Sequence, residues 1–138
     1  MEKLYLLKMN NEDFVTYEQA VSLKKLGFDW EVNHYYHDNP ELEIYVSYCL
    51  QRSFTYRDYN NYDSERISAP TLAQAQKWLR KNKSYYIYPR YEGDKMWGFA
   101  ITNLNKDSVN FIRFGTYQSF EDALSVGITE CINLISKQ

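Results

Sequence analysis

The sequence predicts an α+β fold in which a mainly antiparallel sheet has three helices packed on one face. Three observations support this class: a helix-capping pattern recurs three times, stretches of alternating apolar residues lie between the caps, and turn-forming residues join those stretches. The expected order is α-β-β-(β)-α-β-β-β-α, in which the parentheses mark a weakly patterned strand at 52–59. At 138 residues we expect a single domain over 1–138.

Each predicted helix begins after a Thr or Ser whose side chain can accept a hydrogen bond from the first turn. These caps are Thr16, Thr71 and Ser119, and a Gln or Asp follows each of them three residues later. Gly27 suits the left-handed position that ends the first helix. The third helix has its apolar residues on one face: Phe120, Ala123, Leu124, Gly127, Ile128, Cys131 and Ile135.

Period-two alternation predicts two hairpins and one further strand. Residues 30–36 and 42–48 alternate across a turn at 37–40, and residues 85–88 face 97–101 across 92–95. Residues 109–114 add a strand. The polar, aromatic segment 51–66 is either the extra strand or a flexible loop, and we predict the loop for most of it. If the strand is present, 14–66 and 68–138 are half-repeats, which makes an internal duplication a hypothesis.

Composition and charge favour a globular protein and argue against a general polyanion binder. The chain is 44% hydrophobic and 25% charged, with a net charge of −2. Residues 1–69 carry 7 basic and 12 acidic side chains, whereas 70–138 carry 9 and 6. Most of the basic excess closes the second helix, where cations complement the helix dipole. These residues are Lys77, Arg80, Lys81 and Lys83.

Cysteine use and hydropathy predict a cytoplasmic protein. Cys49 and Cys131 lie far apart without a Cys-x-x-Cys pattern, which is typical of reduced, buried thiols, although a single disulfide is the alternative. No apolar run has the length of a signal peptide core or a membrane span. We therefore expect no membrane association.

The sequence offers no pattern on which to base catalysis, a metal site or a cofactor. His34 and His37 precede several carboxylates, but their spacing places the two imidazoles on opposite faces of a strand, so we expect a solvated hairpin tip. Glycine-rich phosphate loops, nucleophile elbows and His-Glu-x-x-His are all missing from the sequence. We predict a non-enzymatic protein with no cofactor.

Aromatic content is the unusual feature, since 14 Tyr, 7 Phe and 3 Trp make up 17% of the chain. Clusters of Tyr beside Arg have three interpretations: cross-strand packing, a protein-partner surface, or stacking of single-stranded nucleic acid. We predict a protein-interaction module, and the alternative is a weak single-stranded nucleic-acid binder that also uses Lys83. The predicted surface consists of Arg52, Tyr56, Arg57, Tyr59, Tyr86, Tyr88 and Arg90.

The second half also shares the α-β-β-β-α element order of a double-stranded-RNA-binding domain over 71–136. Such domains present lysines at the start of their last helix, where this chain has Ser119-Phe120-Glu121-Asp122. Acidic side chains at that position repel phosphate. The shared order therefore does not support RNA binding.

Two segments, Ser68–Arg80 and Tyr117–Leu124, resemble a family of small uncharacterised proteins from phages and mobile elements of gut Bacteroides and their relatives. The matching motifs are helix starts and core positions, and the likeness extends loosely from about Phe14 to the end of the chain. The resemblance implies a shared fold and genetic setting, and an accessory protein that binds a host or phage component. It implies no catalytic residue, and the partner and oligomeric state stay open.

Overall fold

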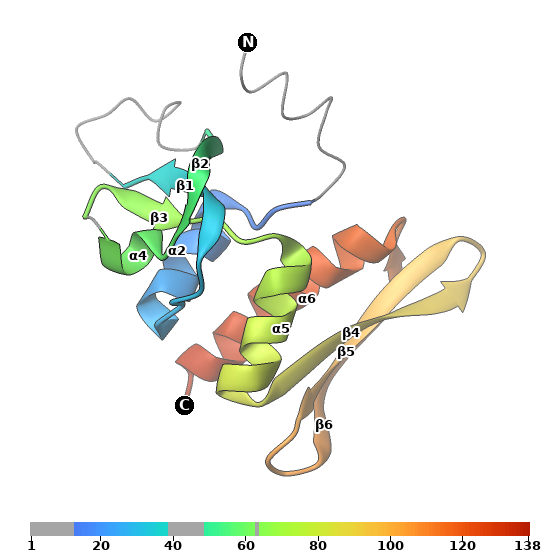
Figure 1. Cartoon of the computed structure of the whole chain (residues 1–138). Helices are drawn as coiled ribbons and strands as arrows, with labels where there is room; N and C mark the ends of the chain where they lie inside the picture. Colours follow the sequence, from blue (N-terminus) through green and yellow to red (C-terminus); the bar gives the residue numbers. More distant parts are fainter. Residues whose placement is uncertain (1–12, 39–48, 63) are drawn as a thin grey trace. The chain divides into compact units, whose positions relative to one another are not determined.

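The computed structural model describes residues 13–38, 49–62 and 64–138 (Figure 1). The chain divides into two compact units, Met1–Thr71 and Leu72–Gln138. Each unit contains a three-stranded antiparallel sheet, so the predicted α+β class with mainly antiparallel sheet is confirmed. The arrangement differs in detail, because the described strands form two sheets and the described residues include a fourth, short helix.

The first unit begins with helix α2, Tyr17–Leu26, whose two ends are fixed as predicted. The backbone N–H of Gln19 donates to the Thr16 hydroxyl at 3.1 Å, and the Gln19 side-chain oxygen accepts from the Thr16 backbone at 2.8 Å. This capping box satisfies two of the donors that a helix start leaves free. Gly27 then ends the helix with φ 98°, a conformation in which a Cβ would be strained.

The sheet of the first unit has the order β2-β1-β3, formed by Val32–His37 (β1), Gln51–Arg57 (β2) and Arg66–Ser68 (β3). The predicted strand at 30–36 corresponds to β1, and the weakly patterned strand at 52–59 corresponds to β2. The predicted strand at 42–48 and most of its turn lie outside the described residues.

The prediction of a flexible loop over 51–66 is wrong. Strand β2, the one-turn helix α4 (Tyr59–Tyr62) and the first residue of β3 lie in this segment. Asn60 fixes the connection, since its side chain accepts from the Ser68 backbone at 2.9 Å and donates to the Phe28 carbonyl at 2.9 Å. Long-range hydrogen bonds of this kind order a segment whose composition alone suggests a loop.

The second unit follows the predicted order closely. Helix α5 spans Leu72–Lys83, and basic side chains occupy its last turn as expected. Strands β4 (Tyr85–Gly93), β5 (Met96–Asn103) and β6 (Ser108–Tyr117) form a meander with the order β4-β5-β6, and helix α6 spans Phe120–Ser136. The predicted hairpin is confirmed, with Ile87 opposite Ile101 and a turn at Asp94 and Lys95.

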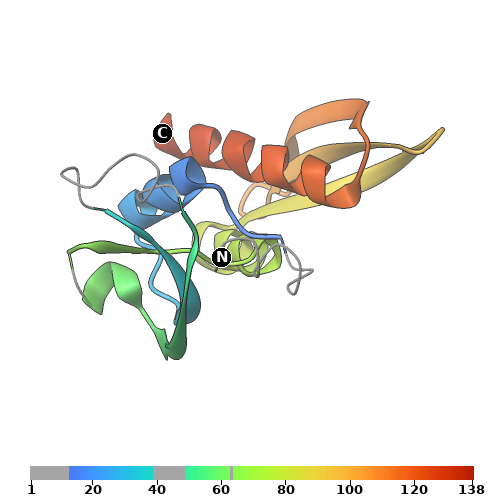
Figure 2. The same ribbon diagram turned by 90° about the horizontal axis from the view of Figure 1, so that it is seen from above.

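Helices α5 and α6 pack on one face of this sheet (Figures 1 and 2). The buried face of α6 contains the predicted residues from Ala123 to Cys131, whereas Phe120 is exposed and Ile135 only half-buried at the helix ends. Gly127 allows α6 to approach the sheet closely, because a Cβ there would lie 2.7 Å from Ile87 Cγ2 and 3.2 Å from Phe99 Cδ2. The odd-numbered residues Ile87 and Phe99 therefore face the helices.

The duplication stays a hypothesis. Both units begin with a helix followed by strands, but the described strand orders differ, because the first strand is central in β2-β1-β3 and the second is central in β4-β5-β6. Residues 39–48, which the duplication needs as a strand, lie outside the described residues.

Candidate interaction surfaces

The structure divides the seven predicted surface residues between the two units. Strand β2 supplies Arg52, Tyr56 and Arg57, and strand β4 supplies Tyr86, Tyr88 and Arg90. Tyr59 belongs to neither group. The predicted residues therefore form two candidate surfaces, one on each unit, and each is described by its own exposure and neighbours.

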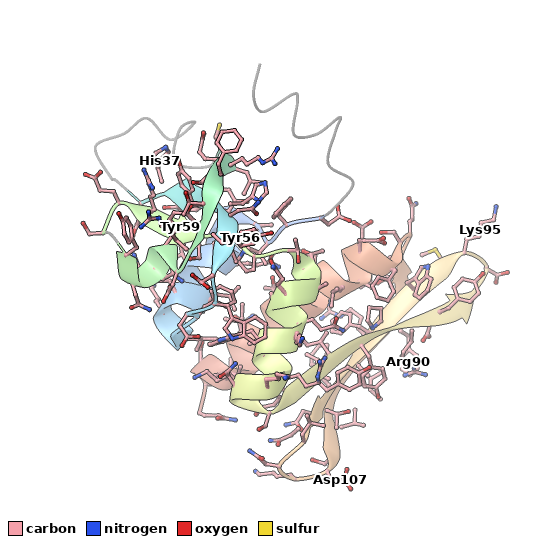
Figure 3. The ribbon with its side chains drawn as sticks, in the orientation of Figure 1. His37, Tyr56, Tyr59, Arg90, Lys95 and Asp107 are labelled. Atoms are coloured by element: carbon pink, nitrogen blue, oxygen red, sulfur yellow. The ribbon has the colours of Figure 1, made fainter. Side chains whose placement is uncertain are left out.

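Tyr59 is a core residue, so its assignment to a binding surface is wrong. It is fully buried, its hydroxyl donates to the Thr55 carbonyl at 2.7 Å, and its ring lies 5.1 Å from that of Tyr35. A buried tyrosine needs a partner for its hydroxyl, and Thr55 supplies it. Figure 3 labels Tyr59 in the first unit together with Tyr56, which is exposed.

The surface on β2 consists of the alternating side chains of Arg52, Phe54 and Tyr56, all of them exposed. Phe54 is 97% exposed and was not among the predicted surface residues, although alternate residues of a strand share one face and Phe54 therefore lies on the same face as Arg52 and Tyr56. The Arg52 guanidinium lies 5.7 Å from the Phe54 ring centre. Arg57 lies on the other side of the strand, and its guanidinium carbon is 4.0 Å from the centre of the Tyr62 ring.

The surface on β4 contains two stacked tyrosines with an arginine near each end. The rings of Tyr86 and Tyr88 have centroids 5.0 Å apart and an interplanar angle of 27°. Arg80 of α5 has its guanidinium carbon 5.9 Å from the Tyr86 ring centre. Arg90 forms an ion pair with Glu92 at 3.7 Å and projects from β4 on the side away from α6 (Figure 3).

This second surface continues across the sheet face that the helices do not cover, which we call the open face. Strand pairing places Tyr88 opposite Ala100 and Ala100 opposite Ile112, so all three side chains share that face. Ala100 is buried between its two larger neighbours. By the same pairing, the open face consists of Tyr86, Tyr88, Arg90, Gly98, Ala100, Thr102, Val109 and Ile112.

The two units differ in charge. The first carries 7 basic and 12 acidic side chains, and the second 9 and 6, so the open face belongs to a unit with a net charge of +3. Arg113 lies on the helix-covered face of β6, where it donates to the Tyr117 hydroxyl at 3.1 Å and pairs with Glu130 at 3.7 Å. The hydrogen bond to Tyr117 raises the pKa of Arg113.

One of the two histidines, His34, does not lie where it was predicted. His34 is buried in β1 against the ring of Phe14 at 4.4 Å, so the expectation of a solvated hairpin tip is wrong for this residue. Burial, and then the charge of Arg52, lower its pKa.

Within 13–38, 49–62 and 64–138, no three His, Cys, Asp or Glu side chains lie together as a metal site would require.

The cysteines are buried and free, as predicted. Burial raises the pKa of Cys131 to about 12, which leaves its thiol protonated and unreactive near neutral pH.

None of the helices in the described ranges is long and apolar enough to cross a bilayer.

Comparison with family models, curated proteins and solved structures finds no match to this chain. The candidate surfaces therefore rest on the geometry alone.

Proposed function

We propose that this chain is a non-enzymatic accessory protein that binds a protein partner through the open face of its second unit. The observation that carries the proposal is the stacked pair of Tyr86, which is exposed, and Tyr88, which is half-buried, on the sheet face that also carries the exposed Ile112. Tyrosine and arginine are enriched at protein interfaces, because a tyrosine ring supplies contact area and its hydroxyl tolerates water.

The resemblance to proteins of Bacteroides phages and mobile elements supports a cytoplasmic role of this kind, in which the partner is a host or phage component.

The test is affinity capture from the native host with a double variant, Tyr86→Ala with Tyr88→Ala, followed by quantitative mass spectrometry. We expect the wild-type chain to retain a specific partner that the double variant loses by tenfold or more. Phe54→Ala is the matched control, because it removes an exposed aromatic ring from the other unit. A partner lost with Phe54→Ala but kept by the double variant would assign binding to β2 instead.

Single-stranded nucleic acid is the second candidate, because guanidinium groups flank the stacked tyrosines. The ion pair of Arg90 with Glu92 opposes it, since a carboxylate beside the platform repels phosphate. Fluorescence anisotropy with labelled oligonucleotides separates the two proposals. Binding at low salt that weakens steeply with added salt would favour nucleic acid. No binding at low salt would exclude nucleic acid as the ligand.

A further inference from the structure

Three aromatic rings meet near the turn of the β4–β5 hairpin, and we call them the aromatic cluster: Tyr91, Trp97 and Phe120. Tyr91 and Trp97 lie directly opposite each other on the two strands, with ring centroids 5.2 Å apart. Phe120, the first residue of α6, meets Trp97 in a T-shaped contact at 5.6 Å. Two strands and a helix thus bring these rings together on the face of the sheet that carries the helices.

The protein core does not account for the aromatic cluster, because much of it remains exposed. Figure 2 shows the hairpin continuing past the first turn of α6, so this helix leaves the end of the sheet uncovered. Tyr91 is 58% exposed and Phe120 41%, and Trp97 is half-buried between them. Phe99, which lies two residues after Trp97 and under α6, is fully buried. The cluster therefore presents aromatic surface to solvent.

The end of the unit that carries the aromatic cluster is acidic, although the second unit as a whole has a net charge of +3. Residues 91–95 and 119–122 contain four carboxylates and one lysine, a net charge of −3. Glu121 and Asp122 directly follow Phe120, and both are exposed. Their position suits the helix dipole. Neither forms an ion pair with another described residue, so their charge can act on a ligand.

Aromatic rings beside carboxylates form an environment that attracts cationic side chains. An ammonium or guanidinium group is drawn to the face of a Trp or Tyr ring, and nearby carboxylates add to the attraction. This chain uses such contacts internally, since the Arg66 guanidinium carbon lies 4.8 Å from the Tyr35 ring centre. Over the described ranges, no Lys or Arg of the chain itself lies over a ring of the aromatic cluster.

We propose that the aromatic cluster binds a Lys or Arg side chain from a basic segment of a partner protein. The rings supply the cation–π contact, and Glu121 and Asp122 supply the opposite charge. An acidic partner would be repelled by the same carboxylates. The cluster lies on the helix-bearing face of the sheet and not on the open face, so the inference does not depend on the function proposed above.

An NMR titration of the isotope-labelled full chain with a hexalysine peptide tests the proposal through the Trp97 indole N–H. We expect a saturable shift of this resonance, whereas the indole of the buried Trp78 stays unmoved and reports an intact fold. Hexalysine acetylated on every side-chain amine is the matched probe, because it keeps the length and loses the charges. An unmoved Trp97 resonance, or an equal shift with the acetylated peptide, would overturn the proposal.

Ring variants separate cation–π contact from general charge attraction. Phe120→Leu removes a ring but no charge, and we expect hexalysine binding about fivefold weaker, which corresponds to about 1 kcal/mol. Phe54→Leu removes an exposed ring from the other unit and should leave the titration unchanged. If Phe120→Leu disturbs folding, Tyr91→Leu at its more exposed position replaces it. Wild-type affinity in a folded ring variant would refute the aromatic cluster as the site.

Charge variants test the carboxylates in the same titration. Glu121→Gln combined with Asp122→Asn keeps all three rings, and we expect hexalysine binding to weaken fivefold or more. Asp107→Asn removes an exposed carboxylate from the β5–β6 turn and should have little effect. Binding as in wild type by the double variant would contradict the role of the carboxylates. The Tyr86→Ala and Tyr88→Ala variant keeps the cluster and should bind hexalysine normally, so the two proposals can fail separately.

Discussion

Substitution of Gly127 by alanine tests whether α6 lies as close to the sheet as the structure shows, and hence which sheet face is open. Two effects oppose each other. Alanine in a helix interior is favoured over glycine by about 1 kcal/mol. The new Cβ, however, would lie 2.7 Å from Ile87 Cγ2 and 3.2 Å from Phe99 Cδ2, and both of these side chains are fully buried.

The steric effect is expected to dominate. Overpacking in a close-packed core costs about 1 to 3 kcal/mol, and a branched methyl on a buried strand cannot move aside cheaply. The net result is a loss of about 1 kcal/mol in the free energy of unfolding, or a Tm lower by about 4 °C. Ile87→Leu moves the branch away from Cβ at nearly constant volume, so the double variant should recover part of the loss.

Denaturant unfolding followed by circular dichroism measures these differences. Asn133→Ala is the matched control, because Asn133 is exposed on α6 and its substitution supplies better helix propensity without a steric clash. We expect a small gain in stability for this control. A Gly127→Ala protein more stable than wild type would refute the close approach of α6 to β4 and β5.

Three further substitutions or conditions test the first unit. Thr16→Ala removes a complete capping box and is expected to lower the free energy of unfolding by about 1 kcal/mol in urea titrations. Tyr59→Phe loses a buried hydroxyl bond and is expected to cost about 1 kcal/mol, whereas Tyr56→Phe at the surface should leave the urea midpoint unchanged. Burial, with a smaller effect of Arg52, lowers the pKa of His34, so the unfolded chain binds the proton more readily. Unfolding free energy measured at a series of pH values should therefore decline below about pH 6.5, and His34→Gln should flatten this decline.

Local signals were sufficient to predict most of the second unit. The cap at Ser119 and the apolar face from Ala123 to Cys131 depend on neighbouring residues, and so does the hairpin between 85–88 and 97–101. For this reason α6 and the β4–β5 pairing agree with prediction. The division into two sheets depends on contacts between distant segments, which capping and alternation do not report.

The errors in the first unit have different origins. The burial of His34 could have been predicted, because it lies on the same face of the strand as Val32 and Tyr36, both of which are buried. The burial of Tyr59 could not, because it depends on a four-residue helix too short to give a helical period. The alternation of faces along β2 would also have placed Phe54 on the surface with Tyr56.

Among the described residues, buried tyrosines and surface tyrosines have different roles, and only the surface ones support a binding function. Tyr36 and Tyr59 are buried, and their hydroxyls donate to the backbone carbonyls of Val15 and Thr55, each at 2.7 Å. These rings fill the core, and their hydroxyls satisfy buried acceptors, so stability alone explains them. Tyr86 is exposed and Tyr88 is half-buried, and the two rings stack on each other at the open face. A partner surface should therefore be sought on β4 and not among the tyrosines as a class.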